Sequence, residues 1–184
     1  MELRLNRRQF VITNNKTVCP ENFISLEIAK NKWLFYDPEL CITLLKGKTQ
    51  IYWLLGQYID GAKDSIRSPE IDDERIRITY YFSGKWVLLS ENSIITDPVG
   101  LLPIYYAQER DNFYISSSIS LLTPFLSKDY LVEDKRQIAW GTANNGYVSW
   151  YIAPFTKYIG VKRLFASQEL SFPESRVSFI QRMY

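Results

Sequence analysis

The sequence predicts an α+β fold, and we expect two antiparallel β-sheets face to face with helices on their outer sides, a four-layer sandwich. The periodicity alone does not distinguish this arrangement from another α+β arrangement. The first observation is a series of short β-prone runs separated by turn residues, which is typical of strands joined by hairpins. The second is that several runs are apolar on both faces, as strands buried between two layers are. The third is the small number of segments with helical periodicity, which leaves helices for the outside.

The clearest strand signals lie in residues 84–122, which we interpret as an antiparallel meander. Asp97 and Gly100 occupy the first and fourth positions of a predicted type I turn, with proline second. A short helix is expected to follow the meander, with Ser118 or Ser120 as its cap. The strands expected in this stretch are residues 85–90, 94–96, 101–107 and 113–117.

Two further helices are expected, over residues 69–82 and 130–137. Ser68 suits the cap of the first helix, and acidic residues in its first turn complement the helix dipole. The competing interpretation of this segment is a strand, because residues 76–82 are β-prone. Residues 141–146 are expected to form a loop. The remaining expected strands are residues 9–13, 23–29, 32–36, 41–45, 50–55, 161–165, 168–172 and 176–180.

Length and composition predict one domain, residues 1–184, with a sizeable apolar core. The chain is 46% hydrophobic and 15% aromatic, so it needs neither metals nor cross-links to fold. A net charge of +2 gives no electrostatic reason to expect nucleic acid as a partner. No signal peptide or long apolar run is present, so we expect a cytoplasmic protein that does not enter a membrane.

Several residue types are absent or rare, and this excludes some kinds of catalytic and metal-binding site. Histidine is absent, which excludes serine and cysteine triads that use it, and histidine-based metal sites. Cys19 and Cys41 are too few for a disulfide scaffold, although one bridge is possible; Cys41 is expected in the core. No phosphate-binding glycine loop occurs, and neither metal nor cofactor is expected.

Four segments occur in an order and at separations that resemble a known family. They are SG at residues 83–84, DPVG at 97–100, LPIYY at 102–106 and YISS at 114–117. This pattern is similar to the N-terminal glutaminase-type domain of asparagine synthetases and their relatives. Thr96 stands where the family has arginine. The resemblance implies the four-layer fold of N-terminal-nucleophile hydrolases.

The residues that carry catalysis in this family do not match. The family's nucleophile is a cysteine exposed by removal of the initiator methionine, whereas Glu2 follows Met1 here. Exposure of Cys19 by self-cleavage is an alternative, but Pro20 would fix the backbone beside it.

The family's N-G-E-I-Y-N segment corresponds to residues 55–60. The resemblance places Leu55 at the oxyanion-stabilising asparagine, and Gln57 at the substrate-holding glutamate. Losing one oxyanion donor costs about 10²–10³ in rate. We therefore expect an inert glutaminase domain with a vestigial pocket. Its candidate residues are Leu55, Gly56, Gln57, Asp60 and Asp97.

Each candidate also has a plain structural interpretation. Residues 54–57 read as a buried strand ending at a glycine turn, and Asp97 as the residue that forms its own turn. The serines at 116–118 are better explained by helix capping than by nucleophilic catalysis. A final group of aromatic residues suits either a core or an exposed contact patch: Trp140, Tyr147, Trp150 and Tyr151.

The resemblance is nearest to relatives that lack the cysteine, such as β-lactam synthetases and lasso-peptide cyclases. It implies an architectural domain that supports an ATP-dependent amide-forming synthetase domain or subunit, or that self-associates. The synthetase loop S-G-G-x-D-S is missing from this chain. The alternatives are a stand-alone binding module that uses the vestigial pocket for a small molecule or peptide, and a hydrolase with an unrecognised N-terminal nucleophile.

Overall fold

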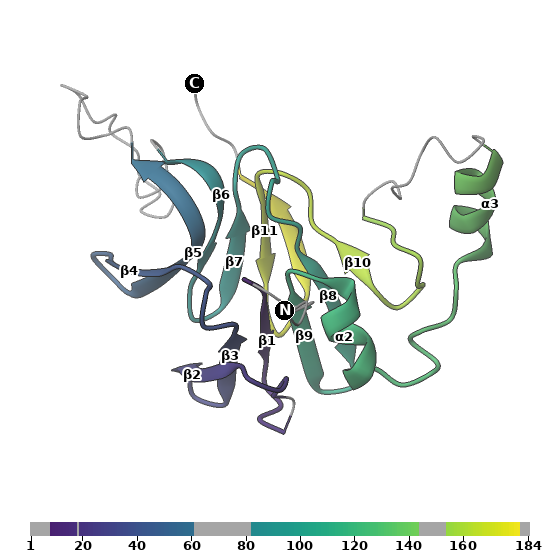
Figure 1. Ribbon diagram of the computed structural model, residues 1–184, viewed down its shortest axis with the longest axis horizontal. Coiled ribbons are helices and arrows are strands. Elements are labelled where there is room, and N and C mark those ends of the chain that lie inside the picture. Colours follow the sequence, from purple (N-terminus) through teal and green to yellow (C-terminus); the bar gives the residue numbers. More distant parts are fainter. Residues whose placement is uncertain (1–7, 18, 61–81, 144–153, 181–184) are drawn as a thin grey trace, which may run out of the picture. The chain divides into compact units, whose positions relative to one another are not determined.

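The computed structural model describes residues 8–17, 19–60, 82–143 and 154–180. These residues form two six-stranded antiparallel sheets (Figure 1). The chain divides into two compact units, and each contains one sheet. Unit 1 consists of Met1–Glu39 and Pro103–Phe165, and unit 2 consists of Leu40–Leu102 and Ala166–Tyr184.

The sheet of unit 1 has the strand order β10-β8-β9-β1-β3-β2. Its centre is buried, because all four residues of β1 and the last four of β9 are inaccessible to solvent. These strands were predicted within a few residues of their observed ends. They are β1 Phe10–Thr13, β2 Ile24–Ala29, β3 Lys32–Tyr36, β8 Tyr105–Glu109, β9 Asn112–Ser116 and β10 Lys162–Arg163.

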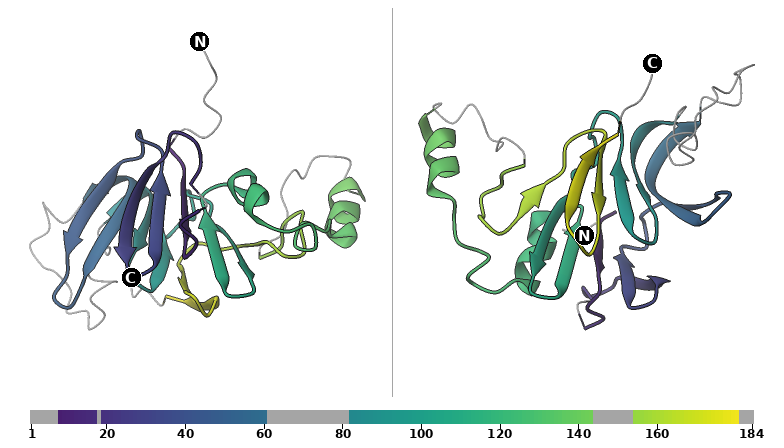
Figure 2. Two further views of the ribbon diagram at one scale, coloured as in Figure 1. Left: turned by 90° about the horizontal axis from the view of Figure 1, so that it is seen from below. Right: turned by 180° about the vertical axis from the view of Figure 1, so that it is seen from behind.

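One face of this sheet packs against α2, Ile119–Leu122, and the following 3-10 turn η2, Thr123–Phe125. Figure 2 shows α2 beside β8 and β9, which it contacts. Leu122 is fully buried in this cluster, and Ile119 and Phe125 pack against it. Burying such a leucine contributes roughly 1.5–3 kcal/mol, so this short helix is held by packing.

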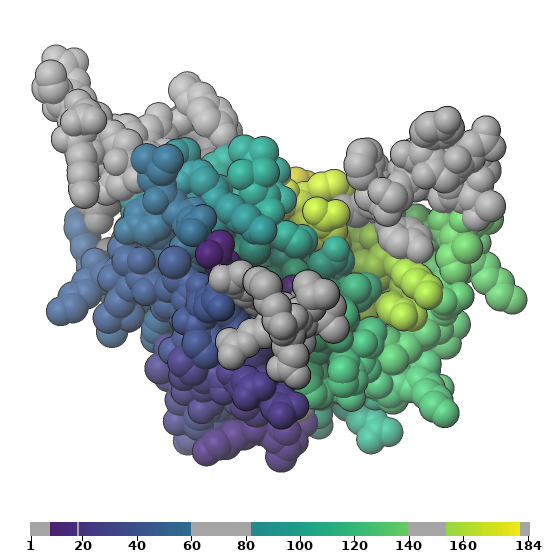
Figure 3. All heavy atoms as spheres, in the orientation of Figure 1, coloured from purple at the N-terminus to yellow at the C-terminus, as the bar shows by residue number. Residues whose placement is uncertain are grey.

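The sheet of unit 2 has the strand order β12-β11-β7-β6-β5-β4. Tyr52, Leu54, Trp86, Leu88 and Ile95 form the core on one of its faces. The hairpin of β4 and β5 lies at the molecular surface, in blue in Figure 3. The strands are β4 Ile42–Lys46, β5 Ile51–Asp60, β6 Phe82–Leu89, β7 Ser93–Thr96, β11 Gln168–Ser171 and β12 Arg176–Phe179.

Two glycines shape the long β5–β6 pair. Gly56 has φ +109° and Gly84 has φ +115°, and they flank the paired residues Gln57 and Lys85. A side chain at Gly56 would collide with the carbonyl oxygen of Lys85, and one at Gly84 with that of Gln57. Because glycine allows both the positive φ and the close approach, β5 continues through Gly56 to Asp60. The expectation that this strand ends at a glycine turn is wrong.

Several element boundaries differ from the prediction. The strand expected from residue 101 begins only at Tyr105, because the preceding segment folds over the Asp97 carboxylate. A helix was expected over 130–137, but the observed helix is α3, Lys135–Ala143. Its last three residues are the first three of the loop expected at 141–146. Asp134 caps α3, since its Oδ1 accepts the Arg136 N–H at 3.0 Å.

The helical layers of the expected sandwich are not found in the part of the chain that the structure describes, where the α-helices are α2 and α3. The helix expected over residues 69–82 lies outside the described residues, except that Phe82 begins β6. Tyr147, Trp150 and Tyr151 also lie outside them, as does the side chain of Trp140.

Candidate functional site

The predicted vestigial residues all belong to unit 2: Leu55, Gly56, Gln57 and Asp60 lie in β5, and Asp97 follows β7. Leu55 lies in β5, between Ile42 of β4 and Val87 of β6, and its side chain is 0% exposed. Gly56 donates its N–H to the Cys41 carbonyl at 2.9 Å. Asp60 ends the strand opposite Phe82. The Leu55 side chain is therefore hydrocarbon inside the core and has no hydrogen-bond donor.

Asp97 follows β7, and β6 separates it from β5. The Asp97 side chain is also 0% exposed. Its Oδ1 accepts the N–H groups of Val99 at 2.9 Å and Leu101 at 3.1 Å, and its Oδ2 accepts that of Leu102 at 3.2 Å. The Gly100 N–H bonds to the Asp97 carbonyl at 3.2 Å, which confirms the predicted turn. This carboxylate organises its own loop.

Both cysteines are free and exposed. The expectation that Cys41 belongs to the core is wrong, because Cys41 precedes the edge strand β4 and not a central strand. Glu2 lies outside the described residues.

The serines at 116–118 mainly fasten β9 to β1. The Ser116 hydroxyl donates to the Phe10 carbonyl at 2.7 Å, and the Ser117 Oγ accepts the Phe10 N–H at 3.1 Å. Ser118 occupies the N-cap position of α2, but its hydroxyl bonds to that of Ser120 and caps no backbone N–H. The expected capping role is therefore wrong, and the serines have a structural function in the sheet.

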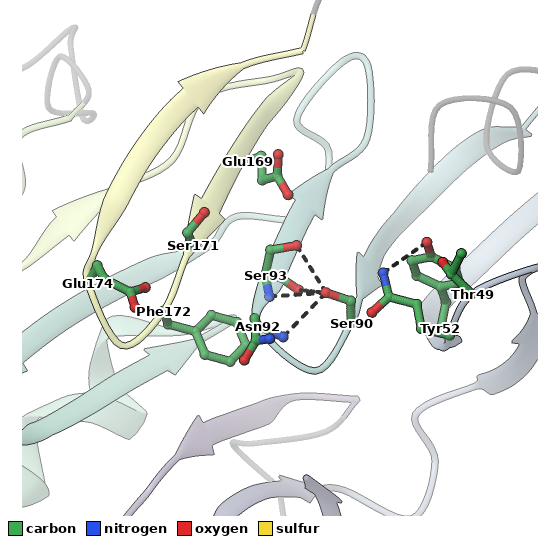
Figure 4. A pocket seen from close by; sticks show the side chains of 10 residues that line it. Thr49, Tyr52, Ser90, Asn92, Ser93, Glu169, Ser171, Phe172 and Glu174 are labelled. Atoms are coloured by element: carbon green, nitrogen blue, oxygen red, sulfur yellow. Dashed lines mark hydrogen bonds between the residues drawn. The ribbon is translucent and has the colours of Figure 1, made fainter. Parts of the chain in front are cut away.

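A cavity lies elsewhere in unit 2, where three hairpin turns meet at one end of the sheet (Figure 4). The turns join β4 to β5, β6 to β7, and β11 to β12. The cavity has a volume of about 630 Å³. We call it the three-turn pocket; its lining residues are Thr49, Gln50, Tyr52, Ser90, Asn92, Ser93, Glu169, Ser171, Phe172 and Glu174.

Hydrogen bonds between lining residues fix the shape of the three-turn pocket. The Ser90 Oγ accepts the Ser93 N–H at 3.1 Å and lies 3.0 Å from the Ser93 Oγ (Figure 4). The Gln50 amide donates to the Tyr52 hydroxyl at 3.0 Å. The lining is thus a set of oriented hydroxyl and amide groups, which suits a polar ligand.

The charges on the lining residues are of one sign. Glu169 and Glu174 carry carboxylates, and no lysine or arginine is among the ten described residues that line the pocket. Glu169 lies in β11, paired with Ile95 of β7 and Ser178 of β12, and is 7% exposed. Glu174 lies in the exposed turn that follows. Arg176 of β12 is paired with Ser171, so a basic residue lies beside this end of the sheet as well.

The three-turn pocket has little signature in the sequence. Its residues come from segments about 40 to 80 positions apart, and no motif links them. The one available signal was an acidic residue, Glu169, at an otherwise buried position of a predicted strand.

The sequence matches no known protein-family model, and no curated protein is significantly similar to it. In the described residues no group of three or more acidic, histidine or cysteine side chains is arranged to hold a metal ion. None of the described helices has the length and apolar character needed to cross a membrane.

Proposed function

We propose that this chain is a catalytically inert class II glutamine-amidotransferase-like domain that supports or partners an ATP-dependent amide-forming synthetase module. In this proposal the fold is the N-terminal-nucleophile hydrolase sandwich. The two six-stranded antiparallel sheets support it, because that sandwich is built on two such sheets. The segments that resemble the family lie on or beside β6, β7, β8 and β9.

The observation that carries the inert assignment is the burial of Leu55. The resemblance puts this residue at the oxyanion-stabilising position, and its side chain is 0% exposed and has no hydrogen-bond donor. Glu2 at the nucleophile position offers a carboxylate in place of a thiol. Without a nucleophile and a donor for the developing charge, glutamine hydrolysis has no route through this domain.

A glutaminase assay with the full chain tests the proposal. We expect no ammonia release from glutamine above the buffer rate, and a mass that shows no cleavage before Cys19. We also expect the chain to co-purify with a co-expressed synthetase that carries the S-G-G-x-D-S loop. Ammonia release abolished by Cys19→Ser would overturn the inert assignment, because it would identify a working thiol.

A stand-alone binding module is the second candidate function. The three-turn pocket favours it, because a cavity of about 630 Å³ lined by oriented polar groups is of a size that small molecules occupy. The side chains of Leu55 and Asp97 are each 0% exposed, whereas the three-turn pocket has room for a ligand.

A further inference from the structure

We propose that two copies of this chain pair through β4, antiparallel and edge to edge, about a two-fold axis at Leu44. The pairing joins the unit 2 sheets of the two copies into one continuous sheet. It goes beyond both candidate functions and depends on neither. Three features of β4 support it: an open hydrogen-bonding edge, exposed apolar side chains, and a residue pattern that is complementary to itself.

β4 is bonded to β5 on one side and has an open edge on the other. It is the last strand of its sheet, so no described strand pairs with its outer side (Figure 1). In an antiparallel pair, every second residue exchanges both its N–H and its C=O with the partner strand. The Gly56 N–H donates to the Cys41 carbonyl at 2.9 Å, which places Cys41 among the residues bonded to β5. The Gly47 N–H donates to the Gln50 carbonyl at 2.9 Å and fits the same alternation. The residues of β4 whose backbone groups face outward are therefore Ile42, Leu44 and Lys46.

An apolar row crosses the sheet of unit 2 and stays exposed where it reaches β4. Its members, paired from strand to strand, are Ile94, Leu89, Trp53 and Leu44. Ile94 and Leu89 are fully buried and Trp53 is half-buried, whereas Leu44 is 53% exposed. A second copy at the open edge would extend this row with its own Leu44 and cover both side chains. Cross-strand apolar pairs of this kind stabilise a sheet.

The residue pattern of β4 suits pairing with a second β4. With the axis at Leu44, the two Leu44 side chains are neighbours, and Ile42 of each copy faces Lys46 of the other. This register uses all the outward residues of β4, and because each pair exchanges two N–H···O bonds, about six bonds form. It also keeps the two ammonium groups at opposite ends of the pairing, whereas an axis at Lys46 would set like charges opposite each other.

The other sheet edges of the described chain are less suited to such pairing. β2 has a register shift between Glu27 and Ala29, and irregularities of this kind oppose edge-to-edge association. β10 has two residues. In β12 the Ile180 N–H donates to the Ser167 carbonyl at 2.9 Å, which fixes the alternation there as well. The residues of β12 that face outward are therefore only Val177 and Phe179.

Sedimentation equilibrium of the full chain tests the dimer, with reductant present because both cysteines are exposed. We expect the mass to rise with concentration from 21.6 kDa towards twice that value, with a dissociation constant of about 10–100 μM. Leu44→Lys should weaken the dimer at least about tenfold, because it sets two like charges opposite each other at the axis.

Ile24→Lys is the matched control, because it removes an isoleucine that is 44% exposed on the edge strand β2 and adds the same charge. It should leave the dissociation constant unchanged. A mass that stays at 21.6 kDa up to about 1 mM, or equal weakening by both variants, overturns the proposal.

A mixture of Leu44→Lys and Leu44→Glu chains tests the two-fold contact directly. Each variant alone should associate weakly, whereas the mixed dimer should be about three- to tenfold tighter than either, because opposite charges then meet at the axis. If the mixture is no tighter than the separate variants, the two residues do not face each other and the proposal is overturned.

Amide hydrogen exchange of the unaltered chain decides the outcome if these variants do not fold. The outward amides of β4 should exchange more slowly as protein concentration rises, because the dimer bonds them. The amides of Thr43 and Leu45 are already bonded to β5 and should show no comparable change. Protection that rises with concentration in β12 and not in β4 would place the contact on the other edge of the sheet and overturn the proposal.

Discussion

At the scale of single residues, Asp97 shows how one carboxylate can determine a loop. It is buried and accepts three backbone N–H groups, so the chain from Val99 to Leu102 is wrapped around it. Hydrogen bonds to a charged acceptor contribute roughly 1.5–3 kcal/mol each, but exposed N–H groups that lose the carboxylate can bond to water instead. We therefore expect Asp97→Ala to lower the free energy of unfolding by about 3 kcal/mol. Chemical denaturation measures this loss.

The exposed Asp129 is the control for that substitution, and Asp129→Ala should change stability by less than about 0.5 kcal/mol. Asp97→Asn should lower the free energy of unfolding by less than Asp97→Ala and by more than Asp129→Ala, because its amide keeps one acceptor oxygen. A neutral effect of Asp97→Ala would contradict the role assigned to this side chain.

Glu109 gives a prediction for pH. The side chain and the backbone N–H of Ser127 bond to its carboxylate and lower the pKa of Glu109 below its ordinary value; the backbone bond is 3.1 Å. Because the folded-state pKa is depressed, the stabilisation is complete above the unfolded-state pKa and is lost as pH falls through the folded-state pKa. Carboxyl NMR titration should show the pKa rising towards normal in Ser127→Ala, with Ser120→Ala as the control. An unchanged pKa in Ser127→Ala would show that the hydroxyl is not responsible.

At the scale of elements, the glycines of the β5–β6 pair carry the next prediction. Gly56→Ala and Gly84→Ala each force a Cβ against a facing carbonyl and strain a positive φ. We expect each to cost about 2–4 kcal/mol, since strain of this kind costs about 1–3 kcal/mol and the steric conflict adds to it. Thermal unfolding would measure the loss.

Ser83→Ala, at an exposed site beside Gly84, is the matched control and should have little effect. If Gly56→Ala matched this control, the close approach of β5 and β6 would not be needed for stability.

The elements that sequence reasoning located well are those with local signals. The predicted strands around the Asp97 turn and the hairpin of β2 and β3 follow from alternation and turn residues, which act within a few positions. The boundary of β5 was missed because its continuation depends on how closely β6 approaches Gly56, and α3 was misplaced because Asp134 was not recognised as its cap. The end of β5 therefore depends on non-local packing, whereas the start of α3 depends on a local cap.

The candidate site was harder to predict for the same reason. Leu55 and Asp97 were chosen by resemblance, and the structure places both in the core, where Asp97 acts on its own turn. The three-turn pocket depends on strand order: β11, near the C-terminal end of the sequence, pairs with β7, which brings Ser171 opposite Ser93. Such a return has no local signature in the sequence.

At the scale of the whole molecule, each unit is built from two separate stretches of chain. Unit 2 obtains β11 and β12 from Ala166–Tyr184, while its other strands lie in Leu40–Leu102. The C-terminal stretch is therefore part of that unit's sheet, and a fragment that ends before it leaves β7 as an edge strand.

The last prediction concerns this dependence. Ending the chain after Phe165 removes Leu170 and Phe172, each 1% exposed, whose burial is worth together about 3–6 kcal/mol. That loss is comparable to the whole stability of a typical domain, about 5–15 kcal/mol, so we expect no cooperative unfolding of unit 2. Ending the chain after Ser175 keeps β11 and removes β12, which is mostly exposed, so this chain should still unfold cooperatively. Amide chemical-shift dispersion of β5, β6 and β7 distinguishes the two chains, and native dispersion in the shorter one would show that unit 2 folds without its C-terminal strands.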